Sequence, residues 1–309
     1  MNEKMSQTVL HRPVLLQETL QFLNIREDFN CFDGTGGAGG FSKEIKNMLK
    51  SGILVTVDMD PEAIKVIEKH IGTSEHNFII RDSFENIDGI IERVGIEKLN
   101  AVVLDLGLSS YALDTPERGF SHRFDAELDM RFDKDSNDPP ASEIIRNIKE
   151  EELVRIISHY GEQPGSRRIA KAIKKELPQT TKELSNIVSG LVRRDTREKS
   201  LAKVFMALRI YVNRELERLK KFFDIVPDCM AVGGRLAVIS YHSLEDRIVK
   251  EFFQRESKDC ICPPDYPVCA CQHRATFKII TKKPVRPGSS EIKSNSRARS
   301  ALLRAGERI

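Results

Sequence analysis

The sequence predicts an α/β protein, in which a Rossmann-like domain is interrupted by an inserted all-helical domain. In the first hundred residues, short apolar runs alternate with helical stretches, which is typical of a parallel sheet covered by helices on both faces. From about 113 to 202 the sequence is helical and highly charged, without a convincing strand. β-like segments then return toward the C-terminus.

The expected elements follow one another at regular spacing. An amphipathic helix at 14–23 comes first, and a second helix begins with Pro61 in its first turn. Further helices are expected at 41–49, up to Arg93, and at 244–254. Strands are expected at 29–33, 52–60, 77–83, 100–110, 233–243 and 275–283.

These patterns predict a discontinuous α/β domain. Its first part is expected at 1–112, the helical insertion at 113–203 and its second part at 204–309. The last stretch, 282–309, carries eight Lys and Arg against two Glu. We expect it to be a basic tail, partly ordered by the apolar residues of SALLRA.

The composition is that of an ordinary globular chain, with 31% charged and 40% hydrophobic residues among 309. A formal net charge of +3 is too small to indicate a nucleic-acid partner by itself. No apolar run approaches the roughly 20 residues of a membrane helix. The N-terminus lacks the pattern of a signal peptide, so we expect a cytoplasmic protein without a membrane partner.

A glycine-rich loop follows the first expected strand in the segment FNCFDGTGGAGGF. Glycines allow tight turns and close approach of a ligand, and such a loop before a helix forms one side of a nucleotide crevice. Gly34, Gly36 and Gly39 satisfy G-x-G-x-x-G, which would also suit a dinucleotide enzyme. A tight glycine turn without a ligand is the simpler alternative.

Asp33, directly before the loop, favours a particular cofactor. Its carboxylate would repel a pyrophosphate but would suit a cationic ligand without phosphate, such as S-adenosylmethionine. Asp58 ends the second strand, where an acid can accept hydrogen bonds from both ribose hydroxyls. Near the third strand, Asp82 and Phe84 suit the adenine amino group and ring, or else a helix cap and a core residue. Asp105 ends the fourth strand, at the edge where open α/β sheets bind ligands.

Nine motifs, in this order, resemble the ribosomal RNA small subunit methyltransferase H family (MraW-type). The resemblance extends from His11 to Arg304 and rests on HRPVLLQETL, DGTGGAGGFS, DMDPEAI, LDLGLSSYALD, RGFSHR, ELDMRF, FMALRIYVNRELE, GGRLAVISYHSLEDRIVKEFF and NSRARSALLR. It implies a class I methyltransferase fold and S-adenosylmethionine-dependent methylation of a cytidine N4 amino group in small-subunit ribosomal RNA, near the decoding site. The implied partner is this RNA or the 30S subunit.

The resemblance also implies site residues. Cofactor contacts are expected at Gly39, Gly40, Phe41, Asp58, Phe84 and Asp105. Three positions depart from the family pattern: Phe41 replaces a histidine, Ala112 replaces a glutamine that would contact the cofactor, and Met206 replaces another glutamine. The loss of the amide at Ala112 removes one hydrogen bond, worth about 0.5–1.5 kcal/mol.

Methyl transfer to an aromatic amine requires acceptors that hold the amino group in line with the methyl donor. Asp105, Ser109 and Ser110 are the expected acceptors. His242 is a further catalytic candidate, since imidazole accepts a proton near neutral pH. The alternative is local structure, because Ser243 and Asp246 resemble a capping box.

Three basic segments are candidates for phosphate contacts, or else are solvated helix faces. They comprise Arg167, Lys171, Lys174 and Lys175; Arg193, Arg194 and Arg197; and Arg286, Arg297, Arg299 and Arg304. Aromatic residues make up only 6% and Trp is absent, which favours a flipped cytidine in a pocket over a stacking platform. Asp129, Arg131 and Arg118 are expected to form ion pairs that hold the insertion against the core.

Four cysteines cluster near the C-terminus with the spacing C-x-C-x6-C-x-C. Cys260, Cys262, Cys269 and Cys271 are therefore candidate ligands of a structural zinc ion. Because C-x2-C pairs are commoner in zinc sites, reduced thiols in a surface loop are the alternative.

Two other functions remain open at this stage. An NAD-linked oxidoreductase would share the glycine loop, although Asp33 and the lack of a recognisable hydride-transfer set argue against it. A non-catalytic RNA-binding ribosome assembly factor could keep the fold, and the departures at Phe41, Ala112 and Met206 leave room for it.

Overall fold

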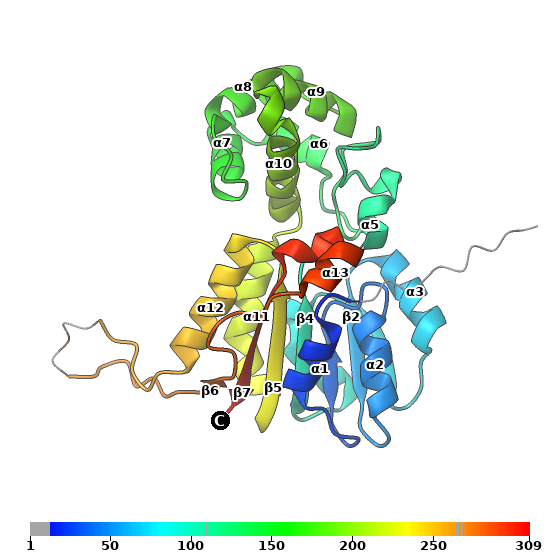
Figure 1. Cartoon of the computed structure of the whole chain (residues 1–309), viewed down its shortest axis with the longest axis vertical. Helices are drawn as coiled ribbons and strands as arrows, with labels where there is room; N and C mark the ends of the chain where they lie inside the picture. The colour runs from blue at the N-terminus through cyan, green and yellow to red at the C-terminus, as the bar shows by residue number, and fades with distance from the viewer. Residues whose placement is uncertain (1–12, 109, 264–265, 267) are drawn as a thin grey trace, which may run out of the picture. The chain divides into compact units, whose positions relative to one another are not determined.

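The computed structural model describes residues 13–108, 110–263, 266 and 268–309 (Figure 1). The chain divides into two compact units, of which one combines 1–107 with 219–309 and the other is 108–218. The second unit extends beyond the predicted insertion, 113–203, at both ends. The larger difference is at the C-terminal end, where helix α10 (Arg197–Val212) stays whole and packs in the core of the helical unit.

The α/β unit contains one sheet, with the strand order β3-β2-β1-β4-β5-β7-β6 among the described residues (Figure 1). Strands β1 to β5 are parallel, whereas β7 runs antiparallel to both β5 and β6. The strands are β1 (Cys31–Asp33), β2 (Leu54–Asp58), β3 (Asn77–Arg81), β4 (Leu99–Asp105), β5 (Met230–Ser240), β6 (Phe277–Ile279) and β7 (Leu302–Arg308).

Both faces of this sheet are buried, as the nearly continuous apolar strands predict. In β4, Val102 and Leu104 enter one hydrophobic cluster, and Ala101 and Val103 enter the other. The first cluster includes side chains of α4 (Ile87–Val94), α11 (Glu215–Cys229) and α12 (Ser243–Glu256). The second includes side chains of α1 (Leu16–Leu23), α2 (Gly40–Met48) and α3 (Pro61–Ile71). The Rossmann-like α/β fold is thus confirmed. Short helices complete the unit: η1 (Phe84–Asn86), α13 (Ser289–Ser294) and η4 (Ser296–Ser300).

The predicted basic tail contains a strand of the sheet, which corrects the expectation for 282–309. In β7 the buried residues Leu303 and Ala305 alternate with more exposed ones, and the strand lies between β5 and β6. Arg304 donates from Nε and Nη2 to Asp246 of α12, at 2.7 and 3.0 Å. Its side chain is only 11% exposed, so Arg304 holds the fold together and is not a free phosphate contact.

The second unit is helical, with one isolated bridge between Glu127 and Thr180 and no strand among its described residues. Its core contains apolar side chains of α6, α7, α8, α9 and α10. The helices are α5 (Ser110–Asp114), η2 (Pro116–Arg118), α6 (Ala141–Asn147), α7 (Glu150–His159), α8 (Ser166–Glu176), α9 (Thr181–Leu191), η3 (Arg194–Thr196) and α10. None of the described helices in either unit has the length and apolarity needed to cross a bilayer.

Asp129, Arg131 and Arg118 all lie inside the helical unit. Arg131 forms a two-point ion pair with Asp129, at 2.8 and 3.0 Å, and Arg118 donates to the carbonyl oxygens of Arg131 and Phe132. These bonds organise the loop between η2 and α6. They join residues of one unit, whereas the sequence analysis predicted ion pairs between the insertion and the core.

Replacing Arg304 with Ala should destabilise the α/β unit, because Asp246 loses a two-point partner in a largely buried position. We expect the free energy of unfolding to fall by about 2 kcal/mol. Urea unfolding followed by far-UV circular dichroism measures this change. Arg299→Ala, at an exposed position, is the matched control. Equal midpoints for the two variants would contradict the structural role of Arg304.

Candidate functional site

Three aspartates end three neighbouring strands of the sheet. Asp33, Asp58 and Asp105 are the last residues of β1, β2 and β4, and β1 lies between the other two. Because the strands are parallel, all three carboxyl groups lie at the same edge of the sheet. This is the edge at which ligands bind in open α/β sheets.

The glycine loop crosses this edge and is bonded to both neighbours of β1. The Gly34 amide donates to the Val103 carbonyl of β4 (3.0 Å), and the Gly36 amide donates to the Val57 carbonyl of β2 (2.8 Å). The Gly37 amide donates to Asp58 Oδ2 at 2.7 Å. The loop conformation is therefore set by the sheet before any ligand binds.

Packing explains part of the glycine pattern. A Cβ atom on Gly36 would lie 2.5 Å from Ile67 Cδ1 and 2.8 Å from Thr56 Cγ2, so no side chain fits there. Gly39 has φ +82° at the N-terminus of α2, where an L-residue would be strained. The ligand-free fold thus favours glycine at both positions. The absence of side chains there also lets a ligand approach the loop closely.

Asp33 is fully buried beneath the loop. Its Oδ2 accepts from the Ser42 hydroxyl (2.5 Å), and Ser42 in turn accepts from the Thr56 hydroxyl (2.8 Å). Burial raises the pKa of Asp33 to about 6, against the lowering effect of these bonds. We therefore expect Asp33 to attract a cation through its negative charge, from beneath the loop.

Asp58 holds the backbone of the two segments that flank it. Its two oxygens accept from the amides of Gly37 (2.7 Å) and Asp60 (2.9 Å). Burial raises its pKa to about 6 as well. Each carboxylate oxygen has two lone pairs, so Asp58 can still accept from the ribose hydroxyls that the sequence suggested.

Asp105 has the most perturbed pKa of the three, raised to about 7, chiefly because it is buried and then because Asp33 and Glu245 lie nearby. The Tyr241 hydroxyl donates to Asp105 Oδ1 at 2.9 Å, which opposes this rise. Burial also raises the pKa of Tyr241, so the phenol stays a donor. The Asp105 amide donates to the Thr35 hydroxyl at 2.6 Å, which ties β4 to the glycine loop.

Tyr241 is the site residue that sequence reasoning missed. It follows β5 directly, in the segment SYHS, and only the pairing of β5 with β4 brings it beside Asp105. The signal available in the sequence was a tyrosine at the end of an expected strand, beside the predicted ligand-binding edge.

The region after β3 is largely occupied by local contacts. Asp82 accepts from Asn86 Nδ2 (2.8 Å) and from Arg93 (2.7 Å), so its carboxylate supports η1 and α4. The half-buried Phe84 packs edge-on against Phe222 at 5.6 Å between ring centroids. Both observations agree with the capping and core alternative, and a ring-face contact of Phe84 with adenine stays a prediction.

The remaining cofactor candidates lie in different parts of the fold. Gly40 begins α2, and Phe41 is buried in the core with Ile45, so the side chain at this departure from the family pattern is part of the core. Ala112 is buried in the core of the helical unit, and Met206 is half-buried on α10. Ser109 lies outside the described residues, and of Ser110 only its place at the start of α5 is described.

His242 is the N-cap of α12 and is paired with Glu245. The Glu245 amide donates to His242 Nδ1 (3.3 Å), and Glu245 Oε2 accepts from the amides of Tyr241 and His242. The capping box is therefore His242–Glu245, one residue before the pair that the sequence suggested. Because Nδ1 accepts, the neutral ring carries its proton on Nε2, which lies 3.0 Å from Glu245 Oε1 without hydrogen-bond geometry. In this tautomer His242 is a donor and offers no free lone pair to a proton.

Several predicted phosphate contacts lie on exposed surface of the helical unit. On α8, Arg167, Lys171 and Lys175 are exposed. Lys174, however, donates to three carbonyl oxygens at the end of α6, at 2.7–2.9 Å. Arg193, Arg194 and Arg197 are exposed too, with Arg193 3.6 Å from Asp195.

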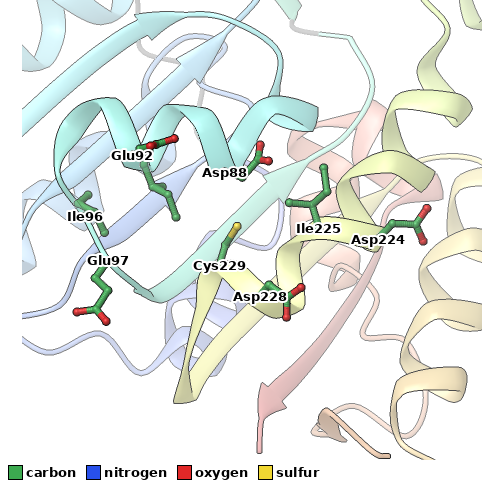
Figure 2. Close-up of a pocket in the computed structure, with 9 residues that line it drawn as sticks. Asp88, Glu92, Ile96, Glu97, Asp224, Ile225, Asp228 and Cys229 are labelled. Carbon is green, nitrogen blue, oxygen red and sulfur yellow. The ribbon is translucent and has the colours of Figure 1, made fainter. Parts of the chain in front are cut away.

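A cavity of about 490 Å³ lies at the opposite edge of the sheet. Its lining includes Glu97, just before β4, and Cys229, just before β5. Figure 2 shows Asp88 and Glu92 on α4 and Asp224 and Asp228 on α11 around it. Carboxylates dominate this cavity, and it is separate from the edge that carries Asp33, Asp58 and Asp105.

The carboxylate edge fits a cationic adenosyl cofactor better than a dinucleotide. Each of the three acids has a raised pKa because its negative charge is poorly solvated, so a bound cation would stabilise the ionised forms. A pyrophosphate at the same edge would add negative charge next to them. The three acidic groups therefore agree with the sulfonium and ammonium groups of S-adenosylmethionine.

Comparisons with known proteins agree with the predicted family. A family model described as the MraW methylase family matches residues 8–309. The ribosomal RNA small subunit methyltransferase H of Halothermothrix orenii is 42% identical over 307 residues, covering 97% of this chain and 98% of that protein. The protein of the same name from Clostridium botulinum strain 657 is 44% identical over 306 residues, covering 97% and 99%. A solved structure, a putative rRNA-methylase from Clostridium thermocellum, is 13% identical with a TM-score of 0.45 and covers 96% of this chain and 98% of that one.

Replacing Asp105 with Asn should stabilise the ligand-free protein as pH rises. The folded-state pKa of Asp105, about 7, exceeds that of an unfolded aspartate, about 3.9. Its stability contribution is therefore complete below about pH 4 and is lost as pH rises through 7. Asn has no such dependence, so we expect its advantage to grow with pH, to the order of 4 kcal/mol above pH 7.

Urea unfolding of both proteins at several pH values between 5 and 8 measures this advantage. Asp88→Asn, at an exposed position of α4, controls for the loss of one charge. An advantage that stays flat or shrinks as pH rises would show that the pKa of Asp105 is not raised in the folded protein.

Proposed function

The chain belongs to the MraW methylase family, and we propose that it transfers a methyl group from S-adenosylmethionine to the N4 amino group of a cytidine in small-subunit ribosomal RNA. The proposal is carried by Asp105, a half-buried acid at the carboxyl edge of the sheet, whose pKa is raised to about 7. The names of the relatives support the RNA as substrate. Cytidine N4, the decoding region and the intact 30S subunit belong to the proposal.

The cofactor would lie along the glycine loop. Asp58 would accept from the ribose hydroxyls, Phe84 would contact the adenine, and Asp33 would add negative charge beneath the loop. The backbone at Gly39 and Gly40 would line the cleft at the start of α2. When bound, the cofactor supplies an electrophilic methyl group on a positively charged sulfur.

Asp105 would hold the amino group of the substrate. The N4 lone pair is delocalised into the cytosine ring, so an acceptor for its N–H groups both orients the nitrogen and makes it more electron-rich. The Tyr241 hydroxyl donates to Oδ1 of Asp105, and Oδ2 would accept from the amino group. After transfer, N4 loses a proton, and a carboxylate with a pKa near 7 is suited to accept it.

His242 would have a supporting part. Its Nδ1 accepts an amide of α12, so we assign proton acceptance to Asp105 and keep His242 as a donor near the end of β5. Ser109 and Ser110 remain candidate acceptors for the amino group.

The RNA would be held through its phosphates by exposed basic side chains. Arg167, Lys171 and Lys175 are spaced along one helix, as contacts to a phosphate backbone require. Such contacts depend on salt and carry no sequence information, so the cytidine would be selected in the pocket, in a flipped conformation. We place this reaction in the cytoplasm, where ribosomes are assembled.

Replacing Asp105 with Ala should abolish methylation, because the amino group loses its acceptor. We expect a fall in rate of about 100-fold or more. The assay follows tritiated methyl transfer to 30S subunits from cells that lack this enzyme, with the labelled nucleoside identified by mass. Asp88→Ala, on the exposed surface of α4, should keep wild-type activity.

Two results would contradict the proposal. Label in a nucleoside other than N4-methylated cytidine would refute the substrate atom. Cofactor binding without transfer by the wild-type enzyme would favour the non-catalytic assembly factor.

Replacing Tyr241 with Phe should shift the pH dependence of the reaction. The phenol lowers the pKa of Asp105, so its loss raises that pKa and leaves less carboxylate at neutral pH. We expect kcat/KM to fall about tenfold at pH 7 and to recover toward pH 9. Tyr266→Phe, at a position where the side chain is 59% exposed, is the control. A loss of equal size at every pH would mean that Tyr241 has a structural role only.

A further inference from the structure

Four cysteine sulfurs converge in the segment between α12 and β6. The Sγ atoms of Cys260, Cys262, Cys269 and Cys271 all lie within 4.8 Å of one another. Cys269 Sγ is 3.6 Å from Cys271 Sγ, which is 3.8 Å from Cys260 Sγ. All four are free thiols, since a disulfide would require about 2.05 Å between sulfurs.

These distances match a tetrahedral metal site. Zinc binds thiolate sulfur at about 2.3 Å, and ideal tetrahedral geometry then separates the sulfurs by about 3.8 Å. The Cys269–Cys271 and Cys271–Cys260 separations, 3.6 and 3.8 Å, agree with that value. The space enclosed by the sulfurs is therefore the size that one zinc ion fills.

Backbone amides donate to two of the sulfurs in a reciprocal pattern. Ile261, between the first two cysteines, donates its amide to Cys271 Sγ at 3.4 Å. Ala270, between the last two, donates its amide to Cys262 Sγ at the same distance. The residue inside each C-x-C turn thus supports a sulfur of the other turn. Amide donors of this kind favour the thiolate form and orient metal ligands.

Hydrophobic packing does not explain why the sulfurs meet. Ile261, Tyr266 and Val268 are 46%, 59% and 75% exposed, so these three side chains form no buried core around the thiols in the described part of the segment. The base of the segment is anchored, since the Thr276 amide donates to the Glu256 carbonyl at 2.7 Å and the Ala275 amide donates to Asp259 Oδ1 at 3.3 Å. Beyond this base, a metal ion is the interaction that would close the loop and offset its chain entropy.

We propose that one zinc ion binds to the thiolates of Cys260, Cys262, Cys269 and Cys271. Each thiol releases its proton to solvent as its sulfur binds the metal. Four protein ligands complete the tetrahedron and leave no open position, so the ion has a structural role and takes no part in methyl transfer. His273 is not a member of this group of converging ligand atoms, and its Nε2 lies 3.2 Å from the Arg255 carbonyl oxygen.

The spacing explains why the sequence alone left this site open. A C-x-C pair is shorter than the usual C-x2-C, so each pair resembles two unrelated thiols. The reciprocal amide bonds show how two such short turns can present all four sulfurs to one point.

Elemental analysis of the full-length protein, expressed with zinc in the medium and purified without chelators, tests the proposal. We expect about one zinc per chain in the wild-type protein. The double variant Cys262→Ser, Cys269→Ser should contain almost none, whereas Cys229→Ala, which removes a buried cysteine outside the cluster, should retain the metal. Circular dichroism verifies that each variant is folded.

Thiol alkylation followed by whole-protein mass spectrometry gives a second measurement that needs no variant. In the wild-type protein the four exposed or half-buried thiols should resist alkylation until a chelator is added, and cobalt substitution should give the visible absorption of a tetrahedral thiolate site. Full alkylation before chelation, iron in place of zinc, disulfides within the cluster, or equal zinc in the double variant would each overturn the proposal.

Discussion

The convergence of three poorly solvated carboxylates at one edge of the sheet is the constraint on which the site depends. Asp33, Asp58 and Asp105 end adjacent parallel strands, and burial raises the pKa of each to about 6 or 7. Poorly solvated acids that lie close to one another destabilise the fold unless hydrogen-bond donors stabilise them. Here amides of the glycine loop and the hydroxyls of Ser42 and Tyr241 provide that support.

This arrangement couples the fold to cofactor chemistry. The Gly37 amide that bonds Asp58 and the Thr35 hydroxyl that binds the Asp105 backbone belong to one turn, so the loop and these acids are positioned together. A cation bound beside them would remove the electrostatic strain that remains, and its binding would then favour the ionised acids. The same feature that lowers the stability of the ligand-free protein therefore provides affinity for a positively charged cofactor.

The strands and helices of the first hundred residues could be predicted because each has a clear period and clear ends. Pro61 and the apolar residues of β4 are examples. The strand β7 was harder to predict, since its buried Leu303 and Ala305 lie inside a basic segment and the strand is stabilised by its neighbours. The helical unit extends beyond the expected end of the insertion, because α10 has buried residues on most sides and gives no boundary at Val204.

The candidate site divides in the same way. Residues at strand ends, such as Asp58 and Asp105, follow from the parallel topology. Tyr241 and the His242–Glu245 capping box do not, because they depend on the pairing of β5 with β4 and on the start of α12. Side-chain partnerships between distant segments carry no local signal in one sequence.

Calorimetric titration of the ligand-free enzyme with S-adenosylmethionine at pH 7, in buffers of different ionisation enthalpy, tests whether the three acids bind a cationic cofactor. We expect binding with net release of protons, because the cation lowers the pKa of Asp105, and we expect no binding of NAD. Proton release should fall in Asp105→Asn. Binding of NAD without S-adenosylmethionine, or cofactor binding with net proton uptake, would contradict the role assigned to the three acids.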